Sequence, residues 1–147
     1  MKGQSLFEVL VAVGVVGIVL LALVGLATSS IKNSSSSKNI SRATRYSQEA
    51  VEWLRGERDR GWSDFAAHVT ASNRYCFNIS PIPPNAWDNT GECTSDEYIS
   101  GTNFIRNVLL TFSSGDSNKI NVVVTTSWSD SQGNHDAKAE TVLTNWK

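Results

Sequence analysis

The stretch from Val9 to Ala27 constrains the fold more than any other part of the chain. It consists of Val, Leu, Ile, Ala and Gly residues, with no charge and no proline. A helix across the roughly 30 Å hydrocarbon core of a bilayer needs about 20 predominantly apolar residues, and this run supplies about 19. We therefore predict a transmembrane helix over residues 4–27.

A carboxylate, Glu8, stands directly before this run. An acidic side chain costs about 2.5–3.5 kcal/mol at the centre of a membrane-spanning helix and less toward its end, so its presence indicates a cationic partner. Cleavage between Gly3 and Gln4 would free an α-amino group about one helical turn before Glu8. The carboxylate would then meet the amine of its own chain or, in a staggered assembly, that of a neighbour.

The same residues carry a family resemblance. Gly3, Glu8 five residues later, the string Val9-Leu10-Val11-Ala12 and the long apolar run resemble the N-terminal signature of type IV prepilins and type II secretion pseudopilins, the minor members above all. The resemblance implies that a membrane prepilin peptidase cuts after Gly3 and methylates the new amine of Gln4. It also implies that Glu8 pairs with the N-terminus of an adjacent subunit during filament assembly.

The resemblance further implies where the chain works and with what. The protein would cross the cytoplasmic membrane once, with its C-terminal domain outside, and would then enter an extracellular or periplasmic filament. Its partners would be the lipid bilayer, the prepilin peptidase, the pilus assembly machinery and other pilin subunits, identical or different. The function implied is that of a structural subunit, a minor one, of a type IV pilus or pseudopilus.

Two other interpretations of the N-terminus stay open. Lys2 and the apolar run are also compatible with a secretory signal cut after Ala27, or with an uncleaved signal anchor. The acidic Glu8 and the length of the run argue against a secretory signal. The positive-inside rule favours a cytoplasmic C-terminus, opposite to the orientation that the resemblance implies, because four cations follow the run: Lys32, Lys38, Arg42 and Arg45.

Length and charge set further bounds. The chain has 147 residues and a formal net charge of −1, which leaves room for one small domain of about 115 residues after the membrane span. No block of like charge suits a nucleic-acid partner, so nucleic acid is not indicated. We divide the chain into a leader (1–3), the transmembrane helix (4–27), an amphipathic second half of that helix (28–61) and a globular region (62–147).

The second half of the helix begins in a serine-rich stretch. We expect Thr28 to Ser37 to stay helical, and an apolar stripe then follows at helical spacing, formed by Ile40, Ala43, Ser47, Ala50 and Leu54. Mixed charges from Glu49 to Trp62 indicate a solvated face, with Glu52–Arg55 and Arg55–Asp59 pairs at helical spacing. Gly61 is the expected stop, and Ser63 the expected cap of a short helix over 64–69.

The globular region reads as strands and loops. Residues 74–79 alternate in polarity like a strand, and residues 85–102, with Trp87, read as an irregular surface loop. Cys76 and Cys93 bracket this loop; a disulfide between them would be worth about 3 kcal/mol if the domain is exported, and two buried thiols are the alternative.

The sequence of the last third predicts three antiparallel strands, each paired with the next along the chain. Alternation over 104–112 and 120–128, with turns around Gly115 and Gly133 and a strand over 137–146, gives a meander with one face to bury. The amphipathic helix would cover that face. The predicted fold is α+β and pilin-like, with a long N-terminal helix, half transmembrane and half amphipathic, packed on a small antiparallel sheet.

No catalytic motif stands out. The sequence has no nucleotide-binding, zinc-protease or hydrolase fingerprint, and its two histidines, His68 and His135, lie far apart. We expect no enzymatic activity, no cofactor and no metal, and we interpret Asp130, His135 and Asp136 as turn residues. The alternative function is a membrane-anchored or secreted β-domain that binds a surface, sugar or DNA through the disulfide loop and Trp87.

Overall fold

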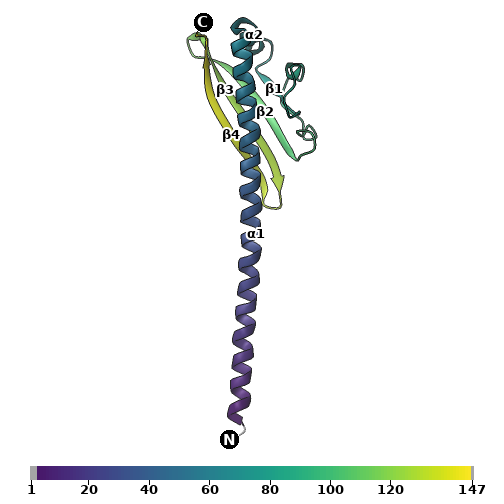
Figure 1. Ribbon diagram of the computed structural model, residues 1–147, viewed down its shortest axis with the longest axis vertical. Helices are drawn as coiled ribbons and strands as arrows, with labels where there is room; N and C mark the ends of the chain where they lie inside the picture. Colours follow the sequence, from purple (N-terminus) through teal and green to yellow (C-terminus); the bar gives the residue numbers. More distant parts are fainter. Residues whose placement is uncertain (1–2, 147) are drawn as a thin grey trace. The chain divides into compact units, whose positions relative to one another are not determined.

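The computed structural model describes residues 3–146, which form two compact units that divide between Asn39 and Ile40. The helix α1 (Gly3–Arg60) supplies the whole described part of the first unit and the beginning of the second (Figure 1). In the first unit the side chains from Leu6 to Ser35 are all exposed. The expected helical state of the serine run is confirmed, since α1 continues through it.

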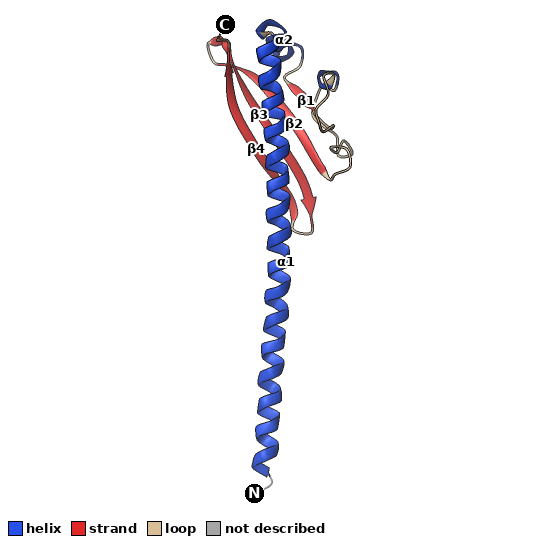
Figure 2. Ribbon diagram, in the orientation of Figure 1, coloured by secondary structure: helices blue, strands red, loops and turns tan. Residues whose placement is uncertain are grey.

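The second unit contains a four-stranded antiparallel sheet in the order β1-β2-β3-β4 (Figure 2). The strands are β1 (Arg74–Cys76), β2 (Phe104–Ser113), β3 (Asp116–Asp130) and β4 (Gly133–Thr144). The last three form the predicted meander, although β3 begins earlier than the predicted strand over 120–128 and β4 begins and ends earlier than the predicted strand over 137–146. Strands β1 and β4 are the two edges of the sheet, and β4 pairs with β3 over its whole length.

The predicted strand over 74–79 is shorter than expected and adds a fourth strand to the meander. It ends at Cys76. The N–H of Phe77 still donates to the carbonyl of Arg106, but the carbonyl groups of Phe77 and Ile79 accept hydrogen bonds from the side chain of Arg106. A charged side chain thus satisfies the carbonyl groups of the segment that follows β1.

The core of the second unit lies between α1 and one face of the sheet. The predicted alternation is confirmed, because the even-numbered residues from Phe104 to Leu110 on β2 and from Ile120 to Trp128 on β3 are all buried. Those in the main core cluster are Val108, Leu110, Ile120, Val122 and Val124. On α1 the residues Ala43, Ser47, Ala50 and Leu54 are buried and Ile40 is exposed. The predicted α+β layout, a long N-terminal helix with a small antiparallel sheet, is confirmed.

The expected cap of the second helix was wrong. Helix α2 (Trp62–Ala71) begins directly after α1, so Ser63 lies inside it, and Gly61 occupies the cap position without a side-chain hydrogen bond. Gly61 does end α1, as predicted, at Arg60. The extended backbone of one residue is enough to separate the two helices.

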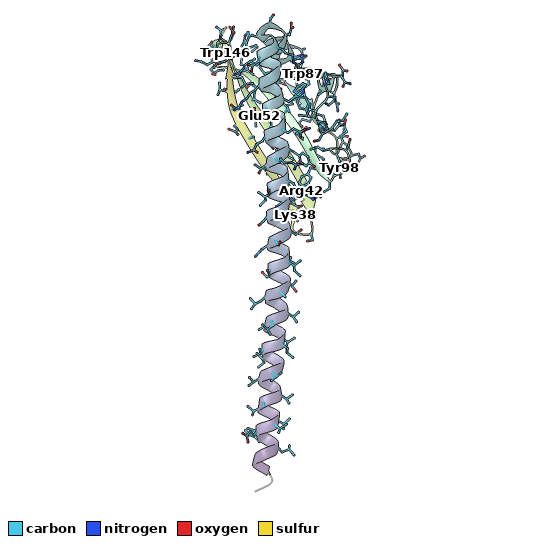
Figure 3. The ribbon with its side chains drawn as sticks, in the orientation of Figure 1. Lys38, Arg42, Glu52, Trp87, Tyr98 and Trp146 are labelled. Atoms are coloured by element: carbon cyan, nitrogen blue, oxygen red, sulfur yellow. A yellow bond between two sulfur atoms is a disulfide. The ribbon has the colours of Figure 1, made fainter. Side chains whose placement is uncertain are left out.

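Trp87 lies in the predicted loop and is half-buried. A short 3₁₀ turn, η1 (Ala86–Asp88), folds its indole back into an aromatic cluster, where it stacks on His68 with 3.9 Å between ring centroids. Its ring centroid lies 5.2 Å from that of Trp53, and its Nε1 donates to Glu57 over 3.2 Å. Packing against α1 and α2 therefore leaves Trp87, which is labelled in Figure 3, half-buried.

Candidate functional site

The apolar part of α1 is the first candidate site. From Leu6 to Leu26 its large apolar side chains are about half or more exposed, and α1 is long and apolar enough in this part to cross a membrane. Glu8 lies exposed at the beginning of this stretch, within the helix that starts at Gly3. Exposure of so many Val, Leu and Ile side chains is stable only in lipid or against other helices.

The predicted processing residues lie at the start of the same helix. Met1 and Lys2 of the predicted leader are outside the described residues, and Gly3 and Gln4 are described only as part of the α1 backbone. Cleavage after Gly3, methylation at Gln4 and pairing of Glu8 with another N-terminus therefore stay predictions.

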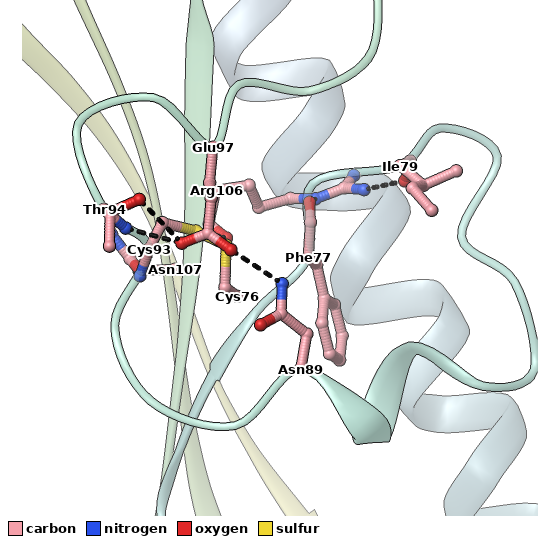
Figure 4. The surroundings of a disulfide bond; sticks show 9 residues. All are labelled: Cys76, Phe77, Ile79, Asn89, Cys93, Thr94, Glu97, Arg106 and Asn107. Atoms are coloured by element: carbon pink, nitrogen blue, oxygen red, sulfur yellow. Dashed lines mark hydrogen bonds between the residues drawn. A yellow bond between two sulfur atoms is a disulfide. The ribbon is translucent and has the colours of Figure 1, made fainter.

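The disulfide is the second candidate site, and here the prediction is confirmed. Cys76 at the end of β1 is bonded to Cys93 in the long loop, 17 residues later. The backbone N–H of Cys93 also donates to Oδ1 of Asn107 over 2.7 Å (Figure 4). Because Asn107 lies opposite Cys76 in the β1–β2 register, both bonds fasten the loop to the sheet face that α1 does not cover.

A tight turn follows the disulfide. The carboxylate of Glu97 accepts hydrogen bonds from the backbone N–H of Thr94 over 2.7 Å, from the Thr94 hydroxyl over 3.1 Å and from the amide of Asn89 over 3.3 Å (Figure 4). The hydrogen bond from the Thr94 backbone is the largest influence that lowers the pKa of this exposed carboxyl below its usual value. The ionised Glu97 thus holds the loop that Cys93 anchors.

Arg106 is the residue that sequence reasoning missed. It lies on β2 between the inward-facing Phe104 and Val108, and its side chain is completely buried. Its guanidinium donates to the carbonyl oxygens of Tyr46 (3.0 Å), Phe77 (3.0 Å) and Ile79 (2.7 Å). The burial of Arg106 could have been predicted from the sequence, because a charged residue there occupies an inward-facing position of an alternating strand.

Glu49 is the charged partner of Arg106, with 2.9 Å between Oε2 and Nη1. It was predicted to lie on a solvated face of the helix, which was wrong, because only 29% of its side chain is exposed. Its two carboxylate oxygens also accept from the Ser80 hydroxyl, each over 3.0 Å. Burial lowers the pKa of Arg106, and the charge and hydrogen bond of Glu49 act in the opposite direction.

Arg106 and Glu49 therefore connect α1, β2 and the segment after β1 at one point. The other charged side chains of this helix region differ in exposure, since Glu57 and Arg58 are mostly buried and Glu52 and Arg60 are exposed. Arg55 binds Glu52 over 2.6 Å, as predicted, and Asp59 is in contact with Arg58.

The turn between β3 and β4 is held by its own side chains. Oδ1 of Asp130 accepts from the backbone N–H of Gln132 over 2.8 Å and lies 3.0 Å from Nε2 of His135. The first of these bonds is the largest influence lowering the pKa of Asp130. Within residues 3–146 no group of three or more His, Cys, Asp or Glu side chains is arranged to hold a metal ion.

Comparisons with known protein families, with curated proteins and with solved structures found no match.

Proposed function

We propose that the chain is a structural subunit, a minor one, of a type IV pilus or a related pseudopilus filament. The observation that carries the proposal is the exposed apolar stretch of α1 with the carboxylate of Glu8 at its beginning. An exposed apolar helix of this length would be unfavourable on a soluble domain. A subunit that moves from lipid into a helical bundle keeps its apolar side chains away from water in both environments. The helix-on-sheet layout of the second unit is compatible with the proposal.

The helix provides two means of association. Gly14, Gly17 and Gly25 present no side chain, and a Cβ atom at each would meet nothing within 4 Å in this chain. Small residues let neighbouring helices approach closely, which favours packing where lipid offers no hydrophobic driving force. The carboxylate of Glu8 would be neutralised by the N-terminal amine of another subunit.

Processing and location complete the proposal. A prepilin peptidase cuts between Gly3 and Gln4 and methylates Gln4, while the chain sits in the cytoplasmic membrane with its C-terminal domain outside. The assembly machinery then extracts it into a filament. The work of the protein is assembly, without enzymatic activity or a cofactor.

The first test is mass spectrometry of the mature N-terminus, after co-expression of the chain with a prepilin peptidase. The proposal expects a membrane-bound species that begins at Gln4 and carries one N-methyl group. A soluble species that begins at Thr28 would indicate a secreted domain, and an uncleaved membrane-bound chain would indicate a signal anchor. Either of these outcomes contradicts the proposal.

The second test compares two glutamates on the same helix. Glu8→Ala should leave the protein folded and membrane-bound and should reduce its recovery in sheared filaments, because the charge pair with the neighbouring N-terminus is lost. Glu52→Ala removes an exposed carboxylate whose partner is Arg55, and recovery should not change. Equal recovery of the two variants would contradict the role of Glu8.

A further inference from the structure

A pocket lies beside the loop that precedes β2. It is formed there by the first residues of β2, the last residues of β3 and the first residues of β4. Its cavity volume is about 300 Å³, at the lower end of the range of small-molecule sites. The side chains of Ile105, Ser127 and Ser129 share the sheet face opposite α1, because their inward-facing neighbours are buried against the helix. Tyr98 from the loop and Asn134 from β4 also line the pocket.

The lining is polar and uncharged. Its residues are hydroxyl- and amide-bearing ones together with Ile105, the exposed Tyr98 and the buried Trp128, and none of them is Asp, Glu, Lys or Arg. An anionic or cationic ligand would find no counter-charge, and a purely apolar ligand would strip water from the hydroxyl and amide groups without replacing its hydrogen bonds. The ligand that fits is neutral and rich in hydroxyl groups.

Tyr98 gives the pocket its specific character. The side chain of Tyr98, labelled in Figure 3, is 46% exposed, yet its neighbours on both sides hold the backbone in place. Before it stands the turn closed by Glu97, and after it Ile99 is completely buried and donates its N–H to the carbonyl of Phe104 over 2.7 Å. An exposed aromatic ring on a fixed backbone loses little conformational entropy when a ligand stacks on it.

The polar rim is also ordered before any ligand arrives. The amide of Asn103 donates to the carbonyl of Ser129 over 3.4 Å, and the Ser129 hydroxyl donates to Oδ1 of Asn134 over 2.6 Å. Within residues 3–146 the hydroxyl of Tyr98 makes no hydrogen bond, so it is available to a ligand. Stacking surface and hydrogen-bonding groups therefore face one small cavity.

We infer that this pocket binds a sugar ring of a neutral saccharide. One face of such a ring carries C–H groups that pack on the ring of Tyr98, and its hydroxyl groups exchange hydrogen bonds with serine and asparagine. The disulfide and the Glu97 turn then act as supports that hold Tyr98 in place. The inference does not rest on the filament proposal, because the pocket lies entirely within the second unit.

The test uses the full chain, labelled with ¹⁵N, in micelles of a detergent without a sugar headgroup. The probes are the methyl glycosides of glucose, galactose, mannose and N-acetylglucosamine, followed through the backbone amide signals. At least one probe should give saturable shifts at Ser127, Ser129 and Asn134. A small exposed site supports affinity in the millimolar range, since 1 mM corresponds to about −4 kcal/mol.

Variants separate the pocket from general effects. Tyr98→Ala should weaken binding about tenfold, the equivalent of about 1.4 kcal/mol, and Tyr98→Phe should keep most of the affinity because the stacking ring remains. Ile79→Ala is the matched control: Ile79 is 45% exposed and lines a different cavity, so binding should not change. The amide spectrum of each variant reports whether it is folded.

Three outcomes would overturn the inference. The first is that no probe gives saturable shifts in the wild-type protein. The second is that binding occurs but Tyr98→Ala and Ile79→Ala affect it equally. The third is that a neutral peptide rich in serine and asparagine binds the pocket and the sugars do not, which would assign the site to a peptide.

Discussion

Two ion pairs on α1 allow a direct test of how the second unit is held together. Glu49 binds the completely buried Arg106, whereas Glu52, one turn further along the helix, binds the exposed Arg55. We predict that Glu49→Ala destabilises the domain strongly and that Glu52→Ala hardly does. Both changes remove a carboxylate from the same helix and replace it with the residue of highest helix propensity, so differences in propensity cancel.

The magnitude follows from burial. Removing one partner of a buried ion pair costs about 3–5 kcal/mol, because the other charge stays buried without compensation. In the Glu49→Ala variant Arg106 would keep its three carbonyl acceptors, and water could occupy the site of the removed carboxylate, because Glu49 is 29% exposed. We therefore expect the free energy of unfolding to fall by about 2–3 kcal/mol, at or below the lower end of that range. An exposed pair such as Glu52–Arg55 contributes about 0.5 kcal/mol or less.

The assay is urea unfolding of the full chain in micelles, followed by tryptophan fluorescence, since all five tryptophans lie in the second unit. For a urea dependence of about 1–3 kcal/mol per molar, Glu49→Ala should lower the midpoint by about 1–2 M relative to Glu52→Ala. In a double-mutant cycle, Glu49→Ala and Arg106→Met should be non-additive by more than about 1 kcal/mol. Equal midpoints for Glu49→Ala and Glu52→Ala would refute the reasoning.

Three further predictions concern the loop and the aromatic cluster. Replacing both Cys76 and Cys93 by serine should cost about 3 kcal/mol in the free energy of unfolding, because the 17-residue separation no longer restricts the unfolded chain; an unchanged urea midpoint would contradict this. Burial lowers the pKa of His68 from its usual 6.5, so the unfolded state binds the proton more readily and stability should fall as pH drops below 6.5, a loss that His68→Gln should remove. The amide signal of Thr94 should titrate with a midpoint below 4.5, because the hydrogen bonds to Glu97 lower the pKa of its carboxyl, and Glu97→Gln should abolish this titration; a midpoint at or above 4.5 would contradict the geometry of the turn.

Elements with a strong local pattern could be predicted from the sequence. The strand alternation around Val108 and Val122 and the helix stripe around Ala50 depend on periodicities that are visible in a short window. The disulfide was predictable because the chain contains only two cysteines. In each case one physical constraint acts on neighbouring residues and leaves few alternatives.

Contacts between distant segments could not be predicted in the same way. The burial of Arg106 depends on Glu49, 57 residues earlier, and on carbonyl groups freed where β1 ends. Trp87 and Tyr98 lie in one irregular loop without a periodic pattern, so no local signal predicts that Trp87 packs against the core and that Tyr98 is exposed. The short turn η1 places the ring of Trp87, and the buried Ile99 fixes the backbone next to Tyr98. Both features depend on tertiary packing.

The open edge formed by β4 has a consequence for a protein that is proposed to crowd against its own copies. An unpaired strand of this length is a template for aggregation through edge-to-edge sheet extension. Asp136, Lys138 and Glu140 project from alternate positions of β4, on the face away from α1, and all three are exposed. Charged side chains on an edge strand disfavour pairing with a foreign strand, so they protect β4 against cross-subunit sheets while the proposed helix-to-helix contact between copies stays possible.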